Sequence, residues 1–158
     1  MMFESCHSVS EVAALYQRLG FSQVSCTFNR VSLVTSPALG AVVMPEVSGR
    51  SIRDRLLKRR QVHPVPVLSY ARRGRDWVFL VGPQWGGAYG TTTLASLAAR
   101  GLRVLSAGER IWLPMSDNRL AWYWITEPEN ARLVPSRTTV ISAFRDHLEQ
   151  TRSQSAGV

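Results

Sequence analysis

Basic side chains gather in two short stretches of the sequence, where they could bind phosphate groups. In GRSIRDRLLKRRQ (residues 49–61), helical spacing places three cations on one side of a helix, with Ile52 and Leu56 facing inward. The second stretch, ARRGR (residues 71–75), is a turn between two apolar runs. The cations of the two stretches are Arg55, Lys58, Arg59, Arg72, Arg73 and Arg75. Contacts of this kind give salt-sensitive binding with little sequence preference. The alternative is a solvated basic face whose Arg stems cover apolar surface.

A glycine-rich loop, VGPQWGGAYGTTT (residues 81–93), follows the second stretch and carries two aromatic residues. Trp85 and Tyr89 could stack on bases beside the arginines. The loop is not a Walker A motif, because Ala88 stands where that motif needs a lysine. The helix that follows has free N–H groups at its N-terminus, and such groups can bind an anion. The sequence leaves open whether this loop does so.

The residue types that bind metals are scattered along the chain. They show no C-x-x-C or H-x-x-x-H spacing, so we expect no metal site and no cofactor. The histidines and cysteines are His7, His63, His147, Cys6 and Cys26. Alternation with Val24 and Phe28 places Cys26 on the apolar face of a strand and predicts a buried, structural thiol.

The sequence also lacks a recognisable catalytic group. Glu127 and Glu129 have the spacing of a metal-binding acidic pair, but they flank Pro128 in a predicted turn, where solvated carboxylates are expected. No G-x-S-x-G motif is present. We therefore expect a protein that is not an enzyme.

Composition and charge bound the class of protein. The chain has 158 residues, of which 45% are hydrophobic, and a net charge of +8 that favours anionic partners. We expect one domain over residues 1–150 and a disordered tail over residues 151–158. No apolar run is long enough to span a membrane, and the N-terminal residues do not resemble a signal peptide, so a cytoplasmic location is expected.

Hydrophobic periodicity and turn residues predict the elements that position these side chains. Helices are expected over residues 9–19, from a cap at Ser51 and Asp54 to about Arg60, and over 92–100. A last helix is expected near residues 138–150, capped by Ser136 or by a threonine just after it. Strands are expected over residues 22–28, 31–36, 40–44, 65–70, 76–82, 102–106, 109–114 and 120–126. Hairpins are expected about Asn29-Arg30, residues 71–75 and Ala107-Gly108. The sequence therefore predicts an α+β fold with a mixed, mostly antiparallel sheet built from hairpins and packed by about four helices.

Alternation along the strands predicts the core. Trp77, Phe79 and Val81 face one way and Val78 and Leu80 the other, so residues 76–82 form a central strand covered on both sides. The remaining strand tryptophans also follow the alternation and are expected in the core rather than in a ligand site. They are Trp112, Trp122 and Trp124.

The succession of motifs GAVVMP, PVLSY, RDWVFLVGP, ERIWLPMS, WYWITEPE and VPSRTTVISAF resembles a family of small actinobacterial proteins. It is similar to the distal half of bifunctional primase/polymerase-like N-terminal domain proteins, over roughly residues 40–146. The resemblance implies a related fold and a connection with DNA. The acidic strand motif that such an enzyme needs for metal is absent here, so the resemblance implies no catalytic residue.

Together these observations predict a non-catalytic, nucleic-acid-associated accessory or regulatory module that binds the phosphate backbone through an Arg-rich surface. The alternative is a protein-interaction module, homodimeric or docking an acidic partner. A third hypothesis is an unrecognised enzyme that uses a nucleotide at residues 82–93. The sequence leaves open the type of nucleic acid, the oligomeric state and the identity of any partner.

Overall fold

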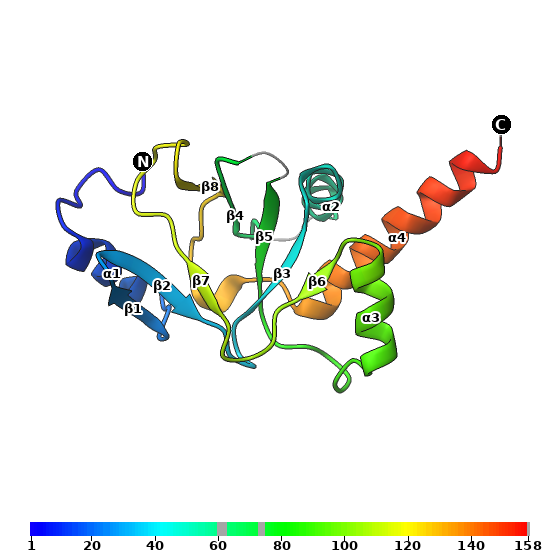
Figure 1. Cartoon of the computed structure of the whole chain (residues 1–158), viewed down its shortest axis with the longest axis horizontal. Coiled ribbons are helices and arrows are strands. Elements are labelled where there is room, and N and C mark those ends of the chain that lie inside the picture. The colour runs from blue at the N-terminus through cyan, green and yellow to red at the C-terminus, as the bar shows by residue number, and fades with distance from the viewer. Residues whose placement is uncertain (60–62, 73–74, 158) are drawn as a thin grey trace.

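The fold is α+β, as the sequence predicts. A computed structural model describes residues 1–59, 63–72 and 75–157, and in this part of the chain four α-helices pack on two antiparallel sheets (Figure 1). The order of helices and strands along the chain is the predicted one, with a short 3-10 helix, Ala131–Leu133, added before the last helix.

The larger sheet has five strands, and its middle strand is β5. Its spatial order is β6 (Arg103–Val104), β3 (Gly40–Pro45), β5 (Asp76–Val81), β4 (Val67–Tyr70) and β8 (Trp122–Thr126). The predicted alternation of β5 is confirmed, because Val78 and Leu80 belong to one core cluster and Trp77, Phe79 and Val81 to the other.

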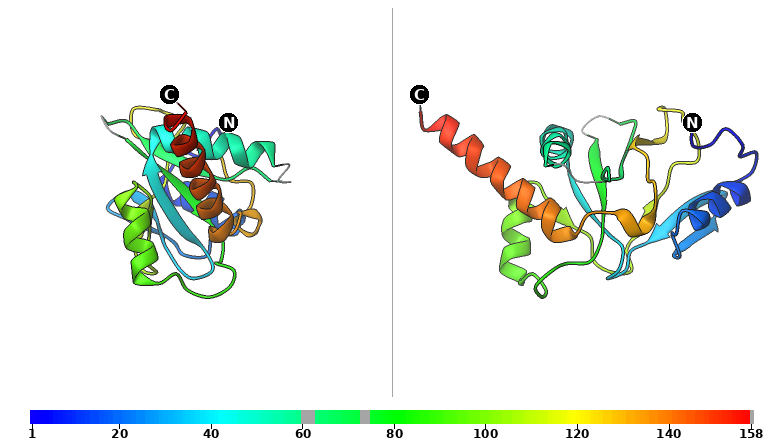
Figure 2. Two further views of the ribbon diagram at one scale, coloured as in Figure 1. Left: turned by 90° about the vertical axis from the view of Figure 1, so that its right-hand side faces the viewer. Right: turned by 180° about the vertical axis from the view of Figure 1, so that it is seen from behind.

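Three helices cover one face of the five-stranded sheet (Figure 2). They are α2 (Glu46–Lys58), α3 (Thr91–Ala99) and α4 (Arg137–Ser155). Ile52 and Leu56 of α2 are buried, as their helical spacing predicts. They meet Ile141 and Phe144 of α4, so the two helices share one apolar seam.

The opposite face of this sheet packs against α1 (Val9–Arg18) and the three-stranded sheet. That sheet has the order β1 (Val24–Thr27), β2 (Arg30–Val34) and β7 (Arg110–Trp112). Tyr16 of α1 is fully buried in this core, where its hydroxyl donates to the Pro114 carbonyl (2.5 Å) and accepts from Trp124 Nε1 (2.9 Å). Burial raises the pKa of Tyr16 far above its ordinary value.

The predicted hairpin about Ala107-Gly108 is wrong in its pairing. β6 pairs with β3 of the larger sheet, whereas β7 pairs with β2 of the smaller one. The turn between them is tied to a distant residue, because the Gly108 N–H donates to the Thr35 carbonyl (2.8 Å) and the Thr35 hydroxyl donates to Ser106 O (2.7 Å). The chain thus crosses from one sheet to the other at this turn.

Other local predictions are also corrected. α2 starts at Glu46 with Pro45 as its N-cap, so Ser51 and Asp54 lie inside the helix rather than at its start. Pro45 thus both ends β3 and precedes the first turn of α2. The first hairpin turns at Phe28-Asn29, both in the left-handed region, one residue earlier than predicted.

The predicted burial of Cys26 is wrong, because β1 is an edge strand of the smaller sheet and the residue is exposed, with its Sγ 3.8 Å from the Val9 carbonyl at the start of α1. At the other end of the chain, α4 continues through Ser155, and its serine and threonine hydroxyls donate to carbonyls four residues earlier. Residues 151–155 of the predicted disordered segment 151–158 are therefore helical. No helix in the described ranges is both long and apolar enough to cross a membrane. The cytoplasmic location stays a prediction.

Candidate nucleic-acid interface

The helix cluster consists of Arg55, Lys58 and Arg59, the three cations predicted on one side of a helix. It lies on the last turn of α2 and at its C-cap, beside α4. Arg59 forms an ion pair with Asp146 (2.5 Å), and Arg55 donates to the side chain of Gln150. Lys58 is exposed. Two of the three cations thus also fasten α2 to α4, and their guanidinium groups are only partly available to an external anion.

The turn cluster consists of the arginines of residues 71–75, and one of them, Arg75, lies at the opposite end of α2. Arg75 donates to Glu46 (2.9 Å) and to the hydroxyl of Tyr123 (3.0 Å), and Glu46 also binds Arg50 (2.5 Å). Hydrogen bonds from Arg50 and then Arg75 lower the pKa of Glu46, and Glu46 in turn raises the pKa of Arg75. Arg75 is therefore engaged by an acidic neighbour within the fold.

Arg72, the next member of the turn cluster, is exposed, while Arg73 lies outside the described residues. Arg75 binds the first residue of α2, and Arg59 is the C-cap of that helix, so the length of α2 separates these two arginines. Thirteen residues at 1.5 Å each correspond to about 20 Å. Arg75 and Arg59 therefore lie at the two ends of α2, and these two described members of the clusters do not share one patch.

The two predicted stacking residues lie apart. The side chain of Trp85 is 75% exposed and, with Arg59, lines a surface hollow over the start of α4. Tyr89 is half-buried, and the guanidinium of Arg145 lies over its ring, 5.9 Å from the centroid. Trp85 is thus the more accessible ring.

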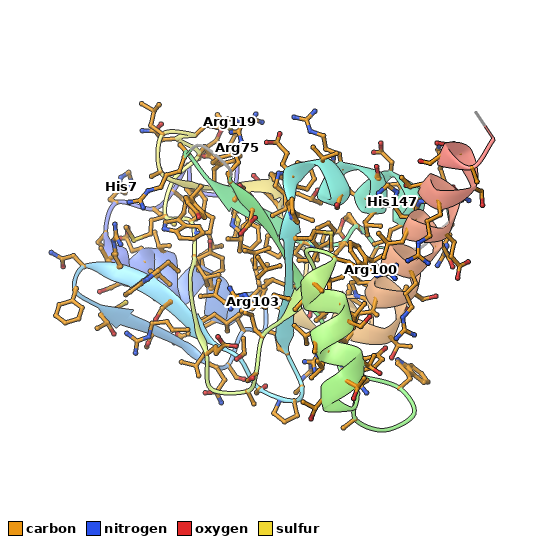
Figure 3. All side chains as sticks on the ribbon, turned by 45° about the vertical axis from the view of Figure 1, so that its right-hand side comes forward. His7, Arg75, Arg100, Arg103, Arg119 and His147 are labelled. Atoms are coloured by element: carbon orange, nitrogen blue, oxygen red, sulfur yellow. The ribbon has the colours of Figure 1, made fainter. Side chains whose placement is uncertain are left out.

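A basic groove that the sequence did not indicate runs between α3 and α4. Two adjoining hollows of about 350 and 660 Å³ share Arg100 and Leu148. Figure 3 shows Arg100 beside these two helices, away from Arg75. We call the set of cations and hydroxyls along it the α3–α4 groove: Thr92, Thr93, Ser96, Arg100, Arg145, Thr151, Arg152 and Ser155. No carboxylate belongs to the described lining, so the groove is positive; of its hydroxyls, those of Thr151 and Ser155 already donate to carbonyls of α4.

A second unforeseen feature is a hollow of about 460 Å³ where the ends of the two sheets meet. We call it the sheet-junction hollow, lined by Arg30, Tyr70, Ala71, Arg72, Trp112, Leu120, Ala121 and Trp122. Trp77 and Trp124 are buried as expected, and Trp122 is half-buried and packs against the same core cluster as Trp124. Trp112 is half-buried and, like Trp122, lies on an edge strand and lines this hollow.

The sequence did hold a signal for this hollow. Arg110 and Trp112 are two residues apart and therefore share a face of β7, and Arg30 lies diagonally across from Trp112 on β2. Both guanidinium groups approach the indole of Trp112, at 5.5 and 5.6 Å from the ring centroid. A strand face that alternates Arg with Trp is a surface pattern rather than a core pattern.

Within the described ranges, no three His, Cys, Asp or Glu side chains lie close enough to hold a metal ion. Comparison of the chain with protein-family models, curated proteins and solved structures found no match. The resemblance to primase/polymerase-like proteins and the absence of catalysis therefore stay predictions.

Proposed function

We propose that this protein is a non-catalytic accessory or regulatory module that binds nucleic acid through the phosphate backbone. The observation that carries the proposal is the α3–α4 groove, in which three arginines line two adjoining hollows that share Arg100 and Leu148, without a carboxylate among the described lining residues. Guanidinium and hydroxyl groups supply most protein contacts to phosphate oxygens.

The dimensions of the groove suit a repeating anion. Arg145 and Arg152 are seven residues apart on α4, which places them about 10 Å apart along the helix axis. That span corresponds to roughly three nucleotide steps of one duplex strand. Arg100 faces them from the end of α3, so a phosphate chain can be contacted from both sides.

The predicted helix cluster supports this interface from a neighbouring surface. Lys58 is exposed, and Arg59 lines a separate hollow with Trp85. Because Arg59 and Arg55 are held by α4, we expect them to contribute less to binding than the arginines of the α3–α4 groove.

The test measures binding of a fluorescently labelled 20-base-pair duplex by anisotropy at low salt. A variant with Arg100, Arg145 and Arg152 all changed to Ala should bind at least about tenfold more weakly. The control removes the same charge elsewhere, at three exposed arginines, Arg18, Arg50 and Arg132, and should lose less than about threefold.

Two results would overturn the proposal. One is an absence of duplex and single-strand binding by the unmodified protein at low salt. The other is an equal loss in the groove variant and the control variant, since that would trace binding to net charge alone. Polyglutamate of matched charge serves as a competitor: if it binds as tightly as the oligonucleotide, the acidic protein partner becomes the better hypothesis.

A further inference from the structure

The sheet-junction hollow differs from the α3–α4 groove because aromatic rings line it together with cations. Tyr70 and Trp122 are cross-strand partners with ring centroids 4.5 Å apart and planes at 49°. Trp112 reaches the same hollow from the other sheet. The two sheets therefore bring three aromatic side chains, from β4, β7 and β8, to one surface depression.

Cations surround these rings. Arg30 and Arg72 line the hollow, and Arg110 adjoins it through its contact with Trp112. All three are exposed, and no acidic side chain belongs to the described lining. Guanidinium planes stack on bases, and their edges donate to phosphate oxygens or to base edges.

From this combination we infer that the sheet-junction hollow binds an unpaired base of single-stranded nucleic acid, with the flanking phosphates held by its arginines. The inference rests on the proposed function and specifies the class of nucleic acid. Bases inside a duplex are stacked on one another, so their faces cannot reach aromatic rings in a surface depression. An unpaired base offers both its faces and its edges.

The shape of the hollow agrees with this ligand. Its volume of about 460 Å³ lies within the range of pockets that take small aromatic ligands. Leu120 stands at the rim with 84% of its side chain exposed, an apolar contact for a sugar or base edge. An acidic peptide could pair with the arginines, but its carboxylates have no flat aromatic face to stack on the rings.

The experiment compares two labelled probes, a 20-nucleotide oligothymidylate and a 20-base-pair duplex, by anisotropy at equal salt. We expect the unmodified protein to bind the single strand at least about tenfold more tightly than the duplex. Trp112→Thr should weaken single-strand binding by about tenfold, in line with the loss of one stacking contact, and leave duplex binding within about threefold. Phe28→Ala, which removes an exposed aromatic ring that does not line the hollow, is the matched control and should change neither.

A second variant tests the same hollow if Trp112→Thr does not fold. Leu120→Glu alters only an exposed rim side chain and places a carboxylate beside the hollow, so it should also weaken single-strand binding by about tenfold. Intrinsic tryptophan fluorescence should be quenched by the single strand in the unmodified protein and in Phe28→Ala.

The inference is overturned if both probes bind equally, or if Leu120→Glu leaves single-strand binding unchanged. In either case the proposed function survives as long as binding is lost in the groove variant. An absence of binding to both probes would overturn the two together.

Discussion

Replacing Tyr16 by Phe tests how the core beneath the smaller sheet is held together. The change removes one fully buried oxygen, which joins α1 to β8 and to the chain after β7. It leaves the Pro114 carbonyl and the Trp124 indole N–H without their hydrogen-bond partner. A buried polar group left unpaired costs about 1–3 kcal/mol, so the two together cost about 2–6 kcal/mol.

We expect the lower part of that range, about 2–4 kcal/mol, because Trp124 keeps 9% of its surface exposed and water can partly replace the lost partner. For a chain of this size, each kcal/mol lowers Tm by about 2–4 °C. Urea unfolding followed by circular dichroism measures the free energy directly.

Tyr70→Phe is the matched control, because the Tyr70 hydroxyl makes no hydrogen bond to the residues that the structure describes. It should change the free energy of unfolding by less than about 0.5 kcal/mol. Adding Trp124→Phe to Tyr16→Phe should cost less than the sum of the two single changes. If Tyr16→Phe is no more destabilising than Tyr70→Phe, the account of this core is wrong.

Two further changes test the packing and charge around α2. Gly49→Ala should gain about 1 kcal/mol of helix propensity but lose more by overpacking, since the new Cβ would lie 2.8 Å from Cε3 of buried Trp77. We expect a net loss of about 1–2 kcal/mol in urea unfolding, and a change near zero for Val47→Ala at an exposed position of the same helix. A net gain of stability in Gly49→Ala would contradict this account of the packing. Glu46→Gln should reduce stability at neutral pH. Hydrogen bonds from Arg50 and then Arg75 lower the pKa of Glu46 in the folded state. The loss of stability in Glu46→Gln should therefore be constant well above the ordinary pKa of about 4.5 and shrink as pH falls through the lower folded value. A loss of stability that persists in acid would refute the pairing.

The sequence predicts the larger sheet well where side-chain alternation decides the structure. Residues 76–81 show an apolar pattern on both faces, and β5 is indeed central with a core on each side. The pairing of β6 and β7 could not be predicted in the same way. Their partners β3 and β2 lie some sixty to eighty residues earlier, and turn residues such as Ala107-Gly108 favour a hairpin whether or not the flanking strands pair.

The candidate site was less accessible to sequence reasoning than the fold. Runs of arginine drew attention to α2, but its neighbour α4 supplies Asp146 and Gln150 to two of those arginines. The arginines of the α3–α4 groove stand singly in the sequence, and only helix packing brings them together. Likewise, the apolar pattern around Trp122 does not reveal that β8 is an edge strand.

The central claim is that the arginines of the α3–α4 groove neutralise phosphates, and the salt dependence of duplex binding tests it most directly. Each phosphate neutralised contributes about −0.9 to the slope of log Kobs against log salt concentration. With three arginines in contact, the slope of the unmodified protein should be steeper by about 2.7 than that of the variant with Arg100, Arg145 and Arg152 changed to Ala. Parallel lines for the two proteins would contradict the claim.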